Sequence, residues 1–287
     1  MVEMMKHKIK GFEIKLGGGI VFFYLFWALG WFFYSHFIKG SLTTPYNPLP
    51  NLKTELLAPM SDGFLLGTDI YGRSLVEILS AGLLYSFGVS LLVSFFAGMI
   101  GLFIGQLSAG DKYFIKIPSD MLTNLIFVFP SILIAILFMS VVGQSFWGLV
   151  FVLSFTGWPA YAKIIRTEVL RIKNLSYVEC SRASGISHWG LFFRIIIPAV
   201  LPVLLVHLFL GMSGVIISEA SLGFLGLGGS EFSFGAGLSS AKSVLLEAPH
   251  ITIFFSLSLA GLIMGLNLLG DGLRDYMDPK NNERISK

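Results

Sequence analysis

The residues that could do chemistry gather in one charged segment of an otherwise apolar chain, 177-YVECSRASGISHWGLFFRIIIPAVLP-202. The segment holds the only cysteine of the chain, Cys180, but no base beside it that would activate a nucleophile. Its Gly185 instead indicates a backbone turn that other residues resist. Two interpretations follow. The segment is either an interfacial loop whose Lys and Arg residues hold the topology, or a compact ledge that another protein grips.

The other polar residues do not form a catalytic or metal-binding set. The five His residues include no pair three or four positions apart, which disfavours a metal site. His207 lies in an apolar run, where either a packed, hydrogen-bonded side chain or a pore-lining one is expected. Glu219 follows at the end of that run, and a pathway or gating role competes there with a solvated helix end.

Phosphate chemistry is also excluded. The chain has no Gly-xxxx-Gly-Lys-Ser/Thr loop, so it is not its own ATPase and we expect no cofactor in this chain. The Gly-rich 223-GFLGLGG-229 lacks the lysine. Irregular backbone at membrane depth is tolerated only where protein covers it or where it lines a cavity, which places this stretch near a pathway. Asp69 and Arg73, four positions apart, could pair on one helical turn as a structural contact.

Membrane-spanning helices must position these candidates. Hydrophobic residues make up 54% of the 287 positions and charged residues 13%, about half the charged share of a soluble domain. Six runs are long enough to cross a core of about 30 Å, which takes roughly 20 apolar residues. The predicted spans are 18–38, 83–107, 121–142, 145–162, 197–218 and 251–270. Only Gly143-Gln144 separates the third from the fourth, so 121–162 could also be one long hairpin.

The distribution of basic residues sets the predicted orientation. With the N-terminus inside, 16 of the 20 Lys and Arg residues fall in inside segments, so both termini are expected to be cytoplasmic. The same bias explains the net charge of +3 without a nucleic-acid partner. Two parts are expected: residues 1–82, with the tail, an uncleaved first span and an external loop, and residues 83–287, with five spans and the loop 163–196. Cys180 should then stay reduced.

Within the loop 163–196 we expect three helical pieces. Residues 164–174 are amphipathic, residues 175–184 form a short helix broken at Gly185, and a second helix over 187–197 opens with a Ser187 cap. Two pairs of glycines at helical spacing, Gly101 with Gly105 and Gly261 with Gly265, predict close helix contacts. Those contacts lie either within this chain or with a partner.

A family resemblance enters at the charged segment. Glu179-Cys180-Ser181-xxx-Gly185, nine residues and then Ile195-x-Ile197-Pro198 resembles the loop of bacterial ABC-importer permeases, Glu-Ala-Ala-xxx-Gly-(nine)-Ile-x-Leu-Pro. The spacing agrees at every position. The departures replace small residues by small ones and an apolar residue by an apolar one, so they leave a helix–turn–helix intact.

Three further stretches resemble the dipeptide, oligopeptide and nickel permeases of this family. They are 66-LGTDIYGRS-74, 219-EASLGFLGLG-228 and 268-LLGDGLRDYMDPK-280, with Ser74 in place of an acidic residue. Four matches in chain order are more specific than any one of them. The chain is most similar to the C-type permease of that branch, one half of a B/C heterodimer.

The resemblance implies an all-α inner-membrane permease with six transmembrane helices and the type I ABC importer fold. It implies a homologous B-type permease as partner, two cytoplasmic ATP-binding subunits that hold ATP and Mg, and an external solute-binding protein. A cytoplasmic coupling helix at 176–190 would contact an ATPase, and Glu179 and Gly185 would fix that contact and its turn. The remaining residues of the matched motif are Cys180, Ser181, Ala183, Ile195 and Pro198.

The function implied is transport, not catalysis. Di- or oligopeptides are the expected solute, with nickel or a nickel chelate as the alternative. A secondary transporter working alone would predict inverted repeats and intramembrane charges. A membrane-embedded enzyme would need catalytic groups clustered at one membrane face. Neither pattern is found in the sequence.

Overall fold

The computed structural model describes residues 2–38 and 48–277. The start of the external loop and the end of the C-terminal motif, at 278–280, therefore lie outside the described residues. The described chain is helical and forms no strand. Its α-helices are α1 Val2–Phe33, α2 Leu75–Ser108, α3 Tyr113–Val128, α4 Ser131–Val142, α5 Phe146–Lys173, α6 Ser176–Ala183, α7 His188–Leu191, α8 Ile197–Phe224, α9 Phe234–Ala241 and α10 Pro249–Met277.

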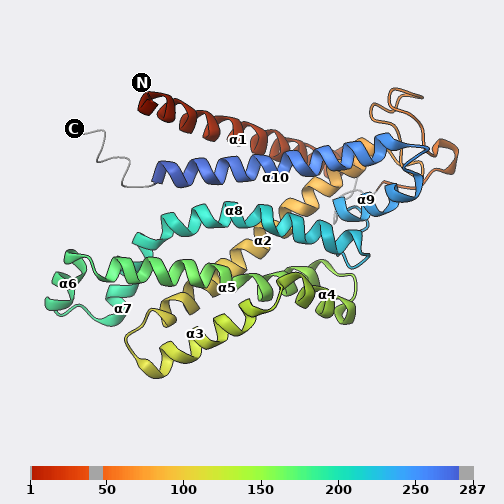
Figure 1. Cartoon of the computed structure of the whole chain (residues 1–287). Coiled ribbons are helices and arrows are strands. Elements are labelled where there is room, and N and C mark those ends of the chain that lie inside the picture. The colour runs from red at the N-terminus through yellow and green to blue at the C-terminus, as the bar shows by residue number, and fades with distance from the viewer. Residues whose placement is uncertain (1, 39–47, 278–287) are drawn as a thin grey trace.

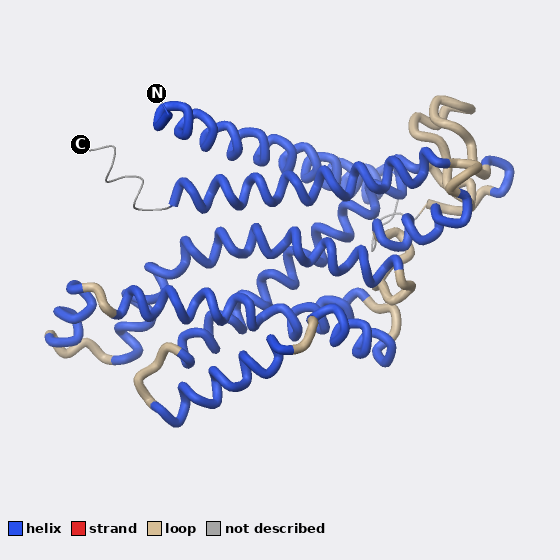
Figure 2. Tube along the Cα trace, viewed as in Figure 1, coloured by secondary structure: helices blue, strands red, loops and turns tan. Residues whose placement is uncertain are grey.

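The long helices form a bundle whose loops gather at its two ends (Figures 1 and 2). Helices α1 and α10 run side by side, and α2 crosses the bundle beside α5 and α8. The start of α1 and the end of α10 lie at the same end of the bundle as α6 and α7 (Figure 1). The loop 48–74 and α9 lie at the other end. Because the chain begins and ends at the same end of the bundle, it must run along the bundle an even number of times.

The six-span prediction is confirmed, with corrected boundaries. Five helices are long and apolar enough to cross a membrane, and α3 with α4, a pair bent by 82°, makes the sixth when the pair is counted as one span. The predicted third span starts too late and misses this break. The bend lies at Phe129-Pro130, where the extended backbone of Phe129 (ψ 138°) follows from the clash between a residue and a proline after it.

The fourth predicted span is too short. Helix α5 does not end at residue 162 but continues through the amphipathic stretch 164–174 as far as Lys173. Ala162, Ile165 and Val169 are all buried along this continuation. The sequence pattern changes from apolar to amphipathic near residue 164, but the helix continues there. The change in pattern therefore does not mark the end of the helix. Between α4 and α5 the chain turns at Gly143 (φ +78°), as predicted.

The glycine pairs pack helices within this chain. A side chain at Gly101 would lie 2.9 Å from the backbone N of Ala162, and one at Gly105 would lie 2.9 Å from Ile165 Cβ, so both face α5. Gly265 faces Ile20 of α1 in the same way, at 2.6 Å. Both glycine faces, including Gly261, are therefore already covered by helices of the same molecule.

Asp69 and Arg73 do pair, but the prediction of a helical turn is wrong. Gly67 (φ +82°) and Gly72 (φ +71°) bend this segment into a tight loop before α2. Arg73 Nε donates to Asp69 Oδ2 at 2.8 Å, and the Arg73 backbone N–H donates to Oδ1 at 2.8 Å. Both residues are buried. Arg73 Nη1 also lies 3.4 Å from Glu231, which joins this loop to the segment after α8.

Candidate functional site

A helical knuckle, residues 176–191, projects from one end of the bundle (Figure 1). Its first helix, α6, ends where Gly185 adopts φ +80°. The Gly185 N–H donates to Arg182 O at 3.0 Å, and the Ile186 N–H donates to Ser181 O at 3.3 Å. This pair of bonds is the Schellman motif, which needs a left-handed residue after the helix and therefore favours glycine. The predicted short helix and its break at Gly185 are confirmed.

The knuckle is anchored through one buried face. Val178 is 0% exposed and packs in a cluster with Ile165 and Val169 of α5. Leu191 and Ile196 enter the same cluster from the segment that follows the turn. Burying a side chain of this size contributes roughly 1.5–3 kcal/mol. The knuckle is thus fixed on α5 and α8 rather than hanging from a loose loop.

The opposite face of the knuckle is open. Glu179, Cys180 and Ala183 are exposed on α6, and Gly185 is exposed at its end. Ser181 is half-buried, and its hydroxyl donates to Tyr177 O at 2.7 Å. A Cβ at Gly185 would meet nothing within 4 Å. Glycine is therefore required here by the backbone angle and not by lack of space.

The second helix of the loop differs from the prediction. Ser187 does cap it, since its Oγ accepts from the Gly190 N–H at 3.1 Å, but the helix does not end near 197. It passes through a π-helical turn at Phe192–Ile196 and continues as α8 to Phe224. The wider turn lets the Ile197 N–H donate to Phe192 O, just before Pro198 removes a donor from the helix. Ile195 is half-buried and Pro198 exposed in this turn region.

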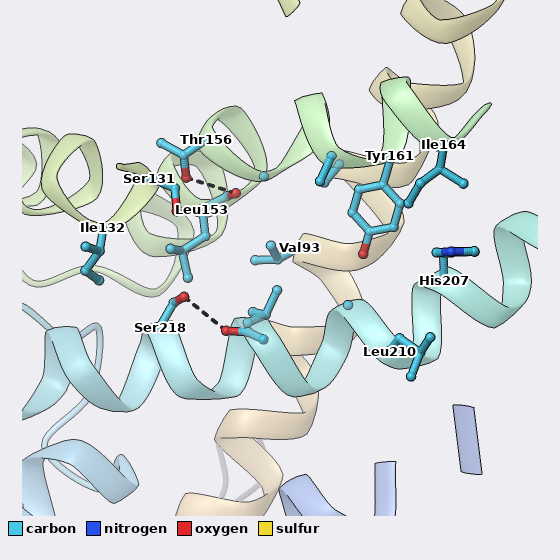
Figure 3. Close-up of a pocket in the computed structure, with 16 residues that line it drawn as sticks. Val93, Ser131, Ile132, Leu153, Thr156, Tyr161, Ile164, His207, Leu210 and Ser218 are labelled. Atoms are coloured by element: carbon cyan, nitrogen blue, oxygen red, sulfur yellow. Dashed lines mark hydrogen bonds between the residues drawn. The ribbon is translucent and has the colours of Figure 1, made fainter. Parts of the chain in front are cut away.

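A cavity of about 410 Å³ lies deeper in the bundle, between α2, α4, α5 and α8 (Figure 3). None of its lining residues is Asp, Glu, Lys or Arg. The hydroxyl of Thr156 donates to Val152 O at 3.0 Å, and that of Ser218 donates to Gly214 O at 3.0 Å. These hydroxyls are thus occupied by their own helices, and the walls are largely apolar.

Two side chains give the cavity its polar character. Tyr161 of α5 and His207 of α8 stand on facing walls (Figure 3). His207 Nδ1 lies 2.8 Å from Val203 O. Because a carbonyl only accepts, this nitrogen carries the proton and leaves Nε2 as the other polar atom of the ring. The Tyr161 hydroxyl is buried. The sequence left a packed and a pore-lining His207 open, and the structure gives this residue both a backbone bond and a place on the cavity wall.

Glu219 lies outside this cavity, although Ser218 lines it. Its side chain is 0% exposed, so the solvated helix end expected as one alternative is wrong. Ser86 of α2 donates to Glu219 Oε2 at 2.8 Å. A buried carboxyl of this kind holds α2 to α8. The pathway role of Glu219 stays a prediction.

The structure therefore separates two groups of predicted residues. Glu179, Cys180, Ser181, Ala183 and Gly185 lie together on the knuckle, and Ile195 and Pro198 follow it in the π-helical turn and at the start of α8. His207 and Glu219 lie farther along α8. Sequence reasoning missed Tyr161 and the cavity itself. The available signal was helical spacing, since Gly157 and Tyr161 lie four positions apart on α5 and Gly211 and Gly214 lie three apart on α8. It also missed Trp189, which is 72% exposed beside the knuckle and stacks on Phe193 with ring centroids 5.9 Å apart.

Comparison with known proteins gives a consistent result. The family described as "Binding-protein-dependent transport system inner membrane component" matches residues 97–283. The chain is 34% identical over 231 residues to the glutathione transport system permease protein GsiD of Pectobacterium atrosepticum, covering 77% of this chain and 74% of that protein. It is 33% identical over 221 residues to GsiD of Escherichia coli O1:K1, covering 75% and 70%.

Two solved structures share the fold. One shows inward-facing conformations of the MetNI methionine ABC transporter, with a TM-score of 0.60 and 19% identity over 70% of this chain and 97% of that one. The other is an amino acid ABC transporter with histidines, with a TM-score of 0.52 and 18% identity over 68% and 91%. At these identities the likeness concerns the fold alone.

Proposed function

Because the chain belongs to the family of binding-protein-dependent transport system inner membrane components, in the peptide branch of ABC importer permeases, we propose that it is the permease subunit of an ATP-driven importer of di- or oligopeptides. It is a transport component and not an enzyme. The observation that carries the proposal is the knuckle, a short exposed helix fixed rigidly on two long spans. Because this helix is packed on α5 and α8, a displacement of the helix by a partner protein moves these two spans with it.

The proposed complex has two permeases, two ATP-binding subunits and an external solute-binding protein. The other permease is a homologous B-type subunit. ATP and Mg are bound by the ATPases, and the exposed face of α6, with Glu179, Cys180 and Ala183, lies in a groove of one of them. Closure of the ATPase pair then moves the spans as rigid bodies between inward- and outward-facing states. In this scheme the knuckle and both termini lie in the cytoplasm and the loop 48–74 lies outside.

A peptide-like solute is supported by the relatives and by the cavity. The relatives named above transport glutathione, a tripeptide, according to their names. The cavity lining contains no Asp, Glu, Lys or Arg, so it does not select peptides by the charge of their side chains. Nickel import is the alternative. A bare nickel ion needs several nitrogen, oxygen or sulfur ligands, and the cavity lining contains only one histidine and no cysteine or carboxylate.

Two measurements test the proposal. The first follows uptake of labelled di-, tri- and tetrapeptides, glutathione and nickel in cells with and without this chain. Loss of peptide uptake alone supports the proposal, loss of nickel uptake alone supports the alternative, and loss of neither overturns both. The second joins Cys180, which is exposed, to its neighbours with a short thiol-to-amine reagent in native membranes. The expected product contains an ATP-binding subunit, and labelled Cys180 without such a product would contradict the docking role.

A further inference from the structure

A second cavity, of about 280 Å³, lies where the end of α2 meets α3 and α5. This region lies toward the end of the bundle that carries α6 (Figure 1). Its lining differs from that of the first cavity, because it is polar and charged. The residues that matter are Lys163 and Arg166 of α5, Asp120 and Asn124 of α3, and Ser108 of α2. Neither the family match nor the transport function assigns these residues a role.

The cavity holds two cations and one carboxylate. Arg166 forms an ion pair with that carboxylate, with Nε 2.9 Å from Asp120 Oδ1 and Nη2 3.2 Å from Oδ2. Lys163 Nζ instead lies over the ring of Phe127, 3.7 Å from its centroid. Within the part of the chain that the structure describes, no carboxylate is in ion-pair range of this Nζ. The cavity therefore carries one uncompensated positive charge.

One hydrogen-bond donor at the cavity is also left without an acceptor. Ser108 is 2% exposed, and its hydroxyl has no hydrogen-bond partner. A buried donor without an acceptor costs about 1–3 kcal/mol, and a charge beside apolar surroundings is costly until it is paired. The Ser108 hydroxyl of α2 and the cationic side chains of Lys163 and Arg166 of α5 therefore line the same cavity.

An oxyanion would both balance the positive charge and accept a hydrogen bond from the unpaired Ser108 hydroxyl. A metal cation is repelled by Lys163 and Arg166, and an apolar group would leave the donor unpaired. The cavity is several times the roughly 30 Å³ that one water occupies in the liquid, so it has room for a phosphate group. We propose that this cavity binds a phosphate-type oxyanion, with Lys163 and Arg166 as its charged contacts and Ser108 as a neutral donor. The phosphate belongs either to a free anion or to the headgroup of an anionic lipid.

Binding is measured on the full chain in nanodiscs of phosphatidylcholine, without any transport step. One arm titrates inorganic phosphate and follows thermal unfolding. The other arm adds phosphatidylglycerol and counts retained lipid by native mass spectrometry. Lys163→Gln should weaken binding about 10- to 100-fold, as expected for loss of a charged hydrogen-bond partner. Lys163→Arg should retain it, which shows that the charge and not the fold is at issue. Lys112→Gln, which removes an exposed cation outside the cavity, is the matched control.

The outcomes are distinct. A phosphate response that Lys163→Gln loses and Lys112→Gln keeps supports a free anion as the ligand. No phosphate response, with retained phosphatidylglycerol that depends on Lys163, supports a lipid headgroup. Equal losses in both Gln variants, or no binding by the unmodified chain in either arm, overturn the proposal. Because no step depends on transport, failure of the importer function would leave this result standing.

Discussion

Two glycine turns, at opposite ends of the molecule, end a helix in the same way. Gly185 follows α6 with φ +80° and Gly226 follows α8 with φ +77°. Each donates its N–H to the carbonyl three residues earlier at 3.0 Å. At neither glycine would a Cβ meet an atom within 4 Å. By backbone geometry alone the two turns cannot be told apart.

Their surroundings differ. The Gly226 carbonyl accepts from Gln144 Nε2 at 2.9 Å, which ties that turn to the connection between α4 and α5. Gly228, two residues on, packs back onto Gly223. Among the described residues, the backbone bonds around Gly185 stay within the knuckle. We call the end with Gly226 the closed end, because its turn is hydrogen-bonded to another part of the chain, and the end with Gly185 the free end, because the bonds of its turn are local.

Gly185→Pro should have the largest effect on transport. Proline holds φ near −65° and has no N–H, so it can neither adopt +80° nor donate to Arg182. We expect peptide uptake to fall at least about tenfold while the protein stays inserted. Uptake by cells and the amount of chain in membranes, measured on the same cultures, check this.

Gly185→Asn is the matched control, because asparagine tolerates the left-handed region and a Cβ has space there. It should keep most of the uptake. Gly226→Pro should instead lower the amount of folded chain, since that turn is hydrogen-bonded to Gln144 in the connection between α4 and α5. Normal uptake by Gly185→Pro would contradict the docking role of the knuckle.

Asp69→Ala should cause the largest loss of stability at the closed end, which also contains the loop 48–74. The substitution leaves the buried Arg73 guanidinium with only its 3.4 Å contact to the exposed Glu231, and breaking a buried pair costs about 3–5 kcal/mol. We expect a large drop in thermal stability and faster proteolysis of the loop 48–74. Uptake should fall only in proportion to the folded protein that remains. Asp69→Asn keeps the backbone bonds to Tyr71 and Arg73 and should lose less; equal losses in the two variants would contradict the ion-pair explanation.

Glu219→Ala should have a smaller effect on stability, about 1–3 kcal/mol, because it removes the acceptor of the buried Ser86 hydroxyl. Glu219→Gln keeps the shape and an acceptor oxygen. If Glu219 serves the pathway, both variants impair uptake without loss of ATPase binding. If the alanine variant blocks assembly while the glutamine variant transports normally, the residue is structural and the pathway role is wrong. Uptake and co-purification of the ATP-binding subunit distinguish these outcomes.

The knuckle was predictable from sequence because its determinants are local. Gly185, the Ser187 cap and the amphipathic stretch before them act within a few residues, and the structure reproduces all three. The length of α5 was not predicted, since an amphipathic continuation and a new interfacial helix have the same pattern. The bend at Pro130 was similarly hidden, because a proline in an apolar run can kink, end or merely start a helix.

The cavities and the buried contacts depend on distant parts of the chain. Ser86 and Glu219 are 133 positions apart, and no spacing rule joins them. The polar cavity is built from three helices and contains residues that, read singly, were only basic residues holding the topology. Sequence predicts which helices form and which side chains are polar. It does not predict which of these polar side chains share one enclosed space.

One substitution near each turn should lower the stability of the protein by a similar amount. Ser187→Ala removes the cap that supports the knuckle, and caps contribute about 1 kcal/mol. Gln144→Ala removes the bond to the Gly226 carbonyl, a contribution of about 0.5–1.5 kcal/mol. Equal losses of stability are therefore expected in thermal unfolding, but the losses of function should differ. Ser187→Ala loosens a surface that must hold its shape against a partner, so uptake should fall two- to fivefold, whereas Gln144→Ala leaves the closed end held by Asp69 and Glu219. If uptake falls equally in the two variants, rigidity at the free turn has no special role, and the difference between the two ends is one of packing alone.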